Sequence, residues 1–292
     1  MPEKNSRRKN MAPLDEDQRA ILYDQDKDPA APSRKPRSRA PGTRLYTLAM
    51  VFCALVFLIS AGILAKRFLD DRRTENEFQN LASLIDTTAA QPSETGEELD
   101  GNSEKFAALL ARNPDFFGWI SIEDTNLNFP VMYAPDNKDF YLRHDFDGQY
   151  SNYGVPYLDE KCVVTGEGTS NNLVVYGHNM KTGTIFGCLT GYKEADYYAQ
   201  HPQIQFDTIY GDGVYEVFAA FAIDVVQDTS FPYNTYLNLD ESEFQEFVSQ
   251  VKSRSDVDSG ITPVYGDQLL TLSTCEYSTA NGRYVVCARR VK

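Results

Sequence analysis

Near its carboxyl terminus the chain reads LLTLSTC (residues 269–275), EYSTANG (276–282) and RYVVCARRV (283–291). The first and third segments are rich in leucine, β-branched and aromatic residues, which is typical of strands. The middle segment ends in an Asn-Gly pair, which favours a turn. This stretch therefore predicts a β-hairpin whose connection returns Arg283 to the side of Cys275.

Side chains alternate between the two faces of a strand, so Thr271, Ser273 and Cys275 share one face, and Leu270 and Leu272 share the other. If the leucines face the core, the Cys275 thiol faces outward at the end of its strand, where a substrate can reach it. The alternative is a buried structural cysteine, because cysteine is among the most buried residue types.

Arg283 is the second candidate for chemistry. At the mouth of the predicted hairpin its guanidinium would lie beside the thiol. There it can lower the thiol pKa and stabilise an oxyanion through fixed N–H donors. The alternative is a solvated hairpin arginine that pairs with an acid.

His178 is the third candidate. The segment Asn172–Tyr176 predicts a strand that ends in Gly177-His178-Asn179, and a glycine at this exit lets the imidazole swing clear of the sheet. A thiolate nucleophile and an imidazole that moves its proton need only meet in space. The alternative is a surface loop histidine. His144, in a charged stretch, and His201, before a proline, are weaker candidates.

The chain beyond residue 116 has the pattern of a mainly β domain. Eight short segments carry β-branched or aromatic residues bounded by Gly, Asp, Asn or Pro and are expected to be strands: Trp119–Ile122, Leu127–Met132, Gly154–Leu158, Asn172–Tyr176, Gln203–Thr208, Val214–Val226, Gln268–Ser273 and Arg283–Val291. Eight short strands with few helices indicate a barrel or a sandwich.

Three helices are expected around these strands. Lys193–Gln200 and Glu241–Val251 are insertions, and the second has apolar residues at i, i+3, i+4 and i+7. A short helix that contains Phe106 precedes the strands and ends near Asn113-Pro114, because the residue before a proline is disfavoured in a helix.

The composition excludes several classes of protein. The chain has 28 basic and 42 acidic residues, for a net charge of −14, so we expect no nucleic-acid partner. Hydrophobic residues make up 42%, which excludes collagen, a coiled coil and a fully disordered chain. Five cysteines without a C-x-x-C pair, and three histidines, argue against a disulfide framework and a metal site. We expect neither a metal nor another cofactor.

The run Leu45–Ala65 contains no formally charged residue. At about 1.5 Å per residue it spans roughly 31 Å, which matches a hydrocarbon core of about 30 Å. We expect a transmembrane anchor; the alternatives are a cleaved signal peptide, whose apolar stretch is usually shorter, and a buried core helix. More Lys and Arg flank the run upstream than downstream, which favours a cytoplasmic amino terminus and an extracellular domain.

Composition divides the chain into four parts. Residues 1–44 mix charges with prolines and are expected to be a disordered cytoplasmic tail. The anchor at 45–65 is followed at 66–102 by an extracellular stalk helix, to about Ile85, and a polar linker. Residues 103–292 form the main domain.

The segment TLSTC (271–275), with Arg283 downstream and Tyr176-Gly177-His178-Asn179 upstream, resembles the sortase family. Sortases are membrane-anchored cysteine transpeptidases of Gram-positive bacteria, with T-L-x-T-C on one strand and an arginine on the next. The likeness covers about Phe106–Val291. It implies that residues 103–292 are a sortase catalytic domain, a closed eight-stranded β-barrel with inserted helices.

The resemblance also implies a mechanism. Cys275 would attack the Thr carbonyl of a C-terminal sorting signal, and His178 would be the general acid and then the general base. Arg283 would orient the substrate backbone and stabilise the oxyanion. The acyl group would pass to an amine, usually on a lipid-linked peptidoglycan precursor.

Several features are similar to class B sortases, which favour pentapeptides with Pro second and Thr fourth. They are the helix before the barrel, the helix Glu241–Val251 and the stretch Tyr141–Gly148 (YLRHDFDG). By analogy, the substrate groove would be lined by Leu142, Thr229, Tyr233, Ser273 and Glu276. Cys162, Cys188 and Cys287 depart from the family pattern, and a disulfide between Cys162 and Cys188 is an open alternative.

Two other functions stay open on the sequence alone. One is a membrane-tethered cysteine peptidase that hydrolyses its acyl-enzyme, which product analysis with and without an amine nucleophile distinguishes from a transpeptidase. The other is a non-catalytic surface module that uses the barrel for binding. Replacement of Cys275 by alanine would leave the binding role of such a module intact.

Overall fold

The computed structural model describes residues 42–88, 102–165 and 168–292. Residues 1–41 of the expected disordered tail and most of the expected linker lie outside the described residues, whereas residues 42–44 of the expected tail are helical. The chain divides into two compact units, Met1–Lys66 and Arg67–Lys292.

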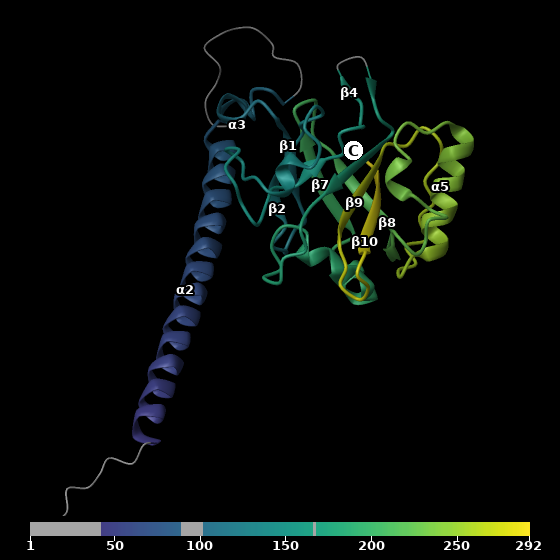
Figure 1. Ribbon diagram of the computed structural model, residues 1–292. Helices are drawn as coiled ribbons and strands as arrows, with labels where there is room; N and C mark the ends of the chain where they lie inside the picture. Colours follow the sequence, from purple (N-terminus) through teal and green to yellow (C-terminus); the bar gives the residue numbers. More distant parts are fainter. Residues whose placement is uncertain (1–41, 89–101, 166–167) are drawn as a thin grey trace, which may run out of the picture. The chain divides into compact units, whose positions relative to one another are not determined.

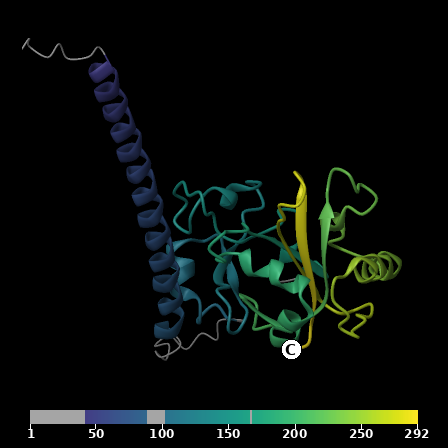
Figure 2. The same cartoon turned by 90° about the horizontal axis from the view of Figure 1, so that it is seen from below.

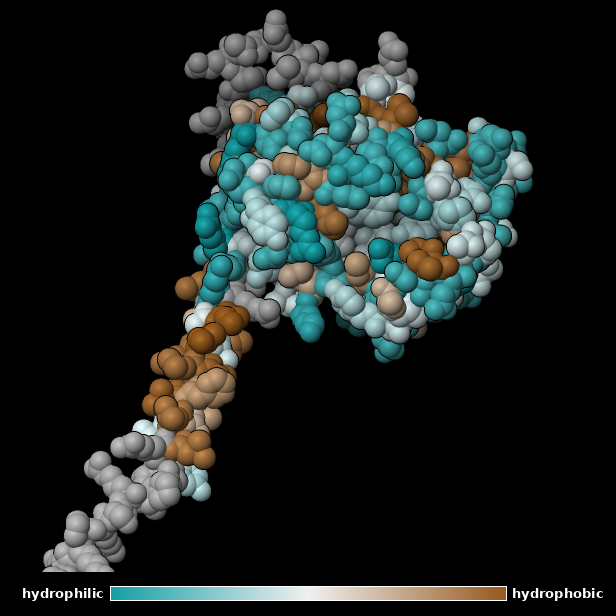
Figure 3. Space-filling view, viewed as in Figure 1, coloured by the Kyte–Doolittle hydropathy of each residue, from teal (hydrophilic) through white to brown (hydrophobic). Residues whose placement is uncertain are grey.

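Helix α2 (Gly42–Thr88) covers the expected anchor and the expected stalk helix without a break. Between residues 45 and 65 its large apolar side chains are exposed, as the brown surface of this segment in Figure 3 shows. This exposure excludes a buried core helix. By length and composition the segment that begins at Leu45 is a candidate membrane span.

The carboxyl-terminal part of α2 belongs to the packing of the second unit. Phe78 and Leu81 are buried in its hydrophobic core, and the Phe78 ring meets the Phe129 ring edge-on at 4.8 Å between centroids. Glu77 forms an ion pair with Arg112, the last residue of α3 (Ala107–Arg112), at 3.8 Å. As expected, α3 ends immediately before Asn113-Pro114.

Eight strands close into a barrel in the order β1-β2-β3-β6-β9-β10-β8-β7 (Figure 1). Their bounds are β1 (Phe116–Ser121), β2 (Asn128–Met132), β3 (Tyr157–Leu158), β6 (Asn172–Tyr176), β7 (Gln203–Thr208), β8 (Val214–Asp224), β9 (Leu269–Cys275) and β10 (Gly282–Arg290). All eight expected strands and the closed barrel are confirmed, and the sandwich is excluded. Strand β3 is shorter than expected, because Gly154 has a φ of 60° and the Val155 N–H donates to the Tyr141 carbonyl of the loop after β2.

The remaining elements lie between these strands. A separate two-stranded sheet is formed by β4 and β5, and the 3₁₀ helices η1 to η3 and the helices α4 and α5 complete the domain: β4 (Val164–Thr165), β5 (Gly168–Thr169), η1 (Phe140–Leu142), η2 (Gly187–Lys193), α4 (Ala195–Gln200), η3 (Tyr233–Thr235) and α5 (Glu241–Arg254). The helix expected at Lys193–Gln200 therefore begins two residues later.

Helix α5 packs on the outer side of the barrel, beside β8 (Figure 2). It begins with a capping box, in which the Asp240 side chain accepts from the Glu243 N–H and the Glu243 side chain accepts from the Asp240 N–H. Its apolar residues, with Phe231 and Tyr233, form a second hydrophobic cluster that covers the outer face of β8, β9 and β10.

This second cluster also determines which residues of β9 reach solvent. Leu270 and Leu272 do face the barrel core, but the opposite face is not open to solvent along the strand. Thr271 and Ser273 are buried, and the first residue of that face to reach solvent is Cys275, which is half-buried at the strand end. The access expected for the thiol therefore depends on the strand ending there.

An ion pair fixes the mouth of the β9–β10 hairpin. The Glu276 carboxylate accepts from Lys193 Nζ, at the end of η2, at 2.9 Å and from the Ser278 N–H at 2.9 Å. A Cβ on Gly282 would lie 2.4 Å from the Glu276 carbonyl oxygen, so only glycine fits this close approach. The hydrogen bonds from Ser278 and then Lys193 lower the pKa of Glu276 from 4.5 to about 2.

We predict that Glu276→Gln lowers the free energy of unfolding at pH 7 by on the order of 1 kcal/mol, because it removes a partly exposed ion pair. Since the pKa of Glu276 is lower in the folded protein, its stabilising effect is complete above pH 4.5 and is lost as the pH falls towards 2. Denaturant unfolding at several pH values should show the difference from the unmodified protein shrinking over this range. Glu123→Gln, at an exposed position, is the matched control, and a difference that stays constant with pH would contradict the role of the ion pair.

Candidate active site

Cys275 and Arg283 face each other across the β9–β10 hairpin. The two residues are direct partners in the antiparallel register, which confirms the hairpin expected from the sequence. Directly opposite residues have Cβ atoms about 4.5–5.5 Å apart and project from the same face. Both side chains are half-buried, and one guanidinium nitrogen of Arg283 donates to the Gly282 carbonyl at 2.9 Å. The thiol and the guanidinium therefore share one partly open edge.

The loop that carries His178 is fixed to the end of β9. Strands β6 and β9 are parallel neighbours, so both end at the same edge of the barrel. The Gly177 N–H donates to the Ser273 carbonyl at 3.1 Å, and the Thr274 hydroxyl donates to the Gly177 carbonyl at 2.7 Å. The Asn179 side-chain amide donates to the Cys275 carbonyl at 2.8 Å. These bonds lie on both sides of His178 and bring its loop to the cysteine.

Gly177 has a different role from the one expected. A Cβ at this position would lie 2.7 Å from the ring of Phe186, which is fully buried. The Phe186 N–H in turn donates to the His178 carbonyl at 3.0 Å. The glycine is therefore required by the close packing of Phe186, which holds the histidine loop in place, and not by freedom of the imidazole to swing.

The His178 ring is oriented by the backbone of Leu142, at the end of η1. Its Nε2 lies 2.8 Å from the Leu142 carbonyl oxygen, and since a carbonyl only accepts, Nε2 carries the proton. In the neutral ring this leaves the lone pair on Nδ1. Burial lowers the pKa of His178 below 6.5, and the charge of Arg143 adds to this while the Leu142 bond opposes it. The imidazole is therefore mainly neutral at pH 7.

The other two histidines are held elsewhere. His144 stacks on Phe140 at 3.8 Å between ring centroids, and its Nδ1 lies 2.7 Å from the Phe140 carbonyl oxygen. His201 follows α4, and its Nδ1 lies 3.0 Å from the Glu123 carbonyl oxygen. These contacts fix both rings in segments other than the loop that is bonded to Cys275.

The five residues expected to line the groove have different surroundings. Tyr233 and Ser273 are buried and joined by a 2.7 Å hydrogen bond between their hydroxyls. Burial raises the pKa of Tyr233, while the Ser273 bond and the nearby Arg283 charge oppose this shift. Leu142 orients His178 through its carbonyl, and Glu276 is held in the ion pair with Lys193. Thr229 is exposed in the segment after β8.

The remaining thiols of the domain are shielded. Burial raises the pKa of Cys162 to about 12, of Cys188 to about 11 and of Cys287 to about 12. These three thiols are therefore protonated, and weakly nucleophilic, at neutral pH. Cys162 and Cys188 are free, which excludes a disulfide between them in this structure. Within the described ranges, no group of three or more His, Cys, Asp or Glu side chains could hold a metal ion.

Sequence reasoning missed the residues that hold the site together. Thr274 and Asn179 belong to the quoted segments TLSTC and YGHN, but their bonds join segments far apart in the chain. The one sequence feature that points to Thr274 and Asn179 is their position next to Cys275 and His178. Lys193 gave no signal, because its pairing with Glu276 depends on the path of η2.

Comparison with known proteins identifies the family. A family model described as the sortase domain matches residues 120–291. Sortase B of Staphylococcus aureus is 26% identical over 254 residues, which cover 85% of this chain and 98% of that protein. Sortase B of Listeria monocytogenes is 27% identical over 241 residues, which cover 81% of this chain and 92% of that protein.

A solved structure agrees with these relatives. The complex of Staphylococcus aureus sortase B with a substrate matches this structure with a TM-score of 0.67 and 27% identity, and the match covers 77% of this chain and 99% of that one. The similarity of this chain to sortase B therefore extends from the sequence to the fold. This chain belongs to the sortase family, within class B, and is a cysteine transpeptidase.

Proposed function

We propose that this chain is a membrane-anchored sortase that cleaves a C-terminal sorting signal after Thr and transfers the surface protein to a cell-wall amine. Cys275, His178 and Arg283 are the proposed catalytic residues. The observation that supports them best is the set of hydrogen bonds from Thr274 and Asn179, which bring the histidine loop to a cysteine that already faces the arginine.

In the first half of the reaction, the Cys275 sulfur attacks the carbonyl carbon of the substrate threonine. A C–S bond forms, the peptide C–N bond breaks, and the leaving amine takes a proton from the His178 imidazolium. The imidazole has taken this proton from the Cys275 thiol. It is therefore neutral again once the thioacyl-enzyme has formed and the peptide has left.

In the second half, the acceptor amine attacks the thioester carbon. A C–N bond forms, the C–S bond breaks, and the proton lost by the amine passes through the imidazole back to the sulfur. The neutral resting state of His178 suits this step, because a neutral ring can accept that proton. Both halves use only side chains of this chain and the two substrates.

Arg283 is suited to stabilise the oxyanion of each tetrahedral intermediate. A guanidinium has five N–H donors, and its bond to the Gly282 carbonyl fixes one edge of the fork while leaving others for the substrate. We propose that Leu142, Thr229, Tyr233, Ser273 and Glu276 shape the groove around the bound peptide. Tyr233 and Ser273 would do so as a buried support below Cys275.

The exposed apolar segment of α2 supports a membrane location for the enzyme. We propose that residues 1–44 are cytoplasmic, 45–65 span the membrane, 66–102 form the stalk and linker, and 103–292 are the extracellular catalytic domain. The charge asymmetry around the span supports this orientation. A lipid-linked peptidoglycan precursor in the same membrane would then be the acceptor.

We predict that a sorting peptide forms a covalent adduct on the unmodified full-length chain and none on Cys275→Ala. The reason is that desolvation raises the pKa of Cys162, Cys188 and Cys287 and keeps these thiols protonated. Intact mass, measured on the chain in detergent with pentapeptides that have Pro second and Thr fourth, detects the adduct. Cys188→Ala is the matched control and should keep it.

The products decide between the remaining functions. A transpeptidase gives the amide of an added amine, whereas a peptidase gives the free acid whether or not the amine is present. An adduct that persists in Cys275→Ala would contradict the proposed nucleophile, and the absence of any adduct on the unmodified chain would support a binding module.

We predict that Arg283→Lys lowers kcat/KM for transpeptidation about 10²–10³-fold, because an ammonium cannot reproduce the planar donors at the oxyanion. Steady-state kinetics should show this loss while the unfolding midpoint stays close to that of the unmodified protein. Arg290→Lys, at an exposed position on the same strand, is the control. Equal activity of the two variants would mean that Arg283 is not part of the reaction.

A further inference from the structure

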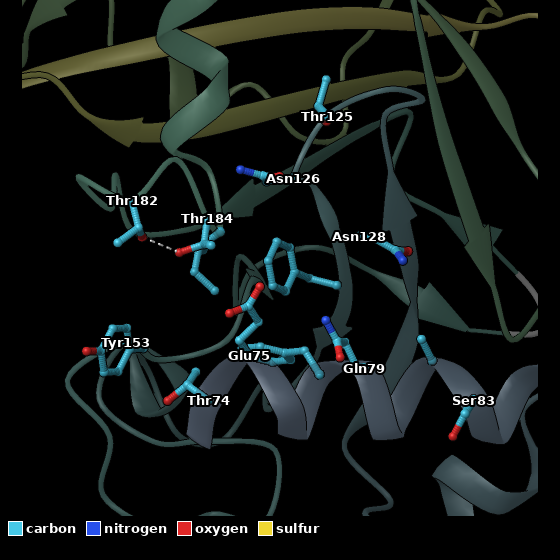
Figure 4. Close-up of a pocket in the computed structure, with 14 residues that line it drawn as sticks. Thr74, Glu75, Gln79, Ser83, Thr125, Asn126, Asn128, Tyr153, Thr182 and Thr184 are labelled. Atoms are coloured by element: carbon cyan, nitrogen blue, oxygen red, sulfur yellow. Dashed lines mark hydrogen bonds between the residues drawn. The ribbon is translucent and has the colours of Figure 1, made fainter. Parts of the chain in front are cut away.

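A cavity of about 520 Å³ lies between the carboxyl-terminal part of α2 and the loops of the barrel (Figure 4). Its volume is in the range of small-ligand sites. It is lined by Thr74, Glu75, Phe78, Gln79, Ala82, Ser83, Thr125, Asn126, Asn128, Phe129, Tyr153, Thr182, Thr184 and Ile185. Cys275 and Arg283 are not among these residues, so the cavity is distinct from the site described above.

The lining combines an apolar surface with uncharged polar groups. Phe78, Phe129 and Ile185 supply the apolar part, and most other lining side chains end in hydroxyls or amides. Figure 4 shows Glu75 and Gln79 on α2 opposite the loops that carry Asn126 and Thr184. A sugar has matching chemistry, because its ring offers C–H groups to an aromatic surface and its hydroxyl and acetamido groups bond to amides and hydroxyls.

Charge and polarity exclude other ligand classes. Glu75 is the only charged lining residue, and the chain as a whole carries a net charge of −14. A phosphate or pyrophosphate would find no cation in this lining and would meet a carboxylate. A lipid tail would remove the many hydroxyls and amides from water without forming hydrogen bonds to them, which costs free energy. A neutral, hydroxyl- and amide-rich ligand remains.

The cavity shares a loop with the proposed catalytic histidine. Thr182, Thr184 and Ile185 lie in the segment that leaves β6 through His178, and Asn179 pairs with Ile185 in an isolated β-bridge. Ile185 has a φ of 56°, which is rare for a β-branched residue and indicates that its surroundings hold it there. A ligand in the cavity would thus contact the loop that positions His178.

We propose that this cavity binds the glycan part of the acceptor, a neutral sugar with acetamido groups, while the acceptor amine reaches the thioacyl-enzyme through the peptide attached to that sugar. This inference rests on the proposed function, because it assigns a second contact to the same acceptor. It makes α2 a part of acceptor recognition in addition to its role as a candidate anchor.

The single tryptophan of the chain reports on the cavity. Trp119 Nε1 donates to the Asn128 side chain at 2.6 Å, and Asn128 lines the cavity. Titration of the full-length protein in detergent with N,N′-diacetylchitobiose should give a saturable change in tryptophan fluorescence. The double variant Gln79→Ala/Asn126→Ala should bind about tenfold more weakly, because two exposed amides that face the sugar are lost. The control Asn80→Ala/Asn238→Ala, also at exposed positions, should bind as the unmodified protein does.

A kinetic comparison tests whether the sugar belongs to the acceptor. Transfer is measured to a short peptide amine and to the same peptide joined to the acetamido disaccharide. The cavity variant should raise KM about tenfold for the sugar-linked acceptor only, with kcat unchanged. No saturable fluorescence change, an equal loss in the control, or an equal effect on both acceptors would overturn this inference alone. Failure of the unmodified protein to form a Cys275 adduct would instead overturn the proposed function.

Discussion

The parallel pairing of β6 with β9 is the constraint on which the site depends. It places the ends of two strands from distant parts of the sequence at one edge of the barrel, and Thr274 and Asn179 then join the loop after β6 to the end of β9. The hairpin adds Arg283 through its register with Cys275. Three groups suited to acyl transfer are therefore brought together by the strand pairing and by the hydrogen bonds of two polar side chains.

The environment of these groups differs from one to the next. His178 is desolvated and kept neutral, with its Nε2 proton directed at the Leu142 carbonyl. Cys275 is half-buried, whereas burial keeps the other domain thiols protonated. The Lys193–Glu276 ion pair joins the mouth of the hairpin that carries Cys275 and Arg283 to η2. Among the four cysteines of the domain, reactivity can thus be confined to Cys275.

Much of the fold could be predicted because its strands are short, β-rich and bounded by turn residues, and because the Asn-Gly turn sets the Cys275–Arg283 hairpin. The covered outer face of β9 could not be predicted, since it depends on how α5 and Tyr233 pack after folding. The role of Gly177 was misread for the same reason, because Phe186 approaches it only in three dimensions. The cavity beside α2 likewise joins segments whose sequences give no sign that they meet.

The most direct test of this account is the acylation rate of Thr274→Val, which removes the hydroxyl bond to Gly177 with little change in side-chain volume. Thr271→Val is the matched control, because it removes another buried hydroxyl bond of β9, to Asn172, away from the histidine loop. The rate of Cys275 adduct formation should fall at least about tenfold in Thr274→Val relative to the control at equal stability. Equal rates in the two variants would contradict the claim that this bond brings the histidine to the cysteine.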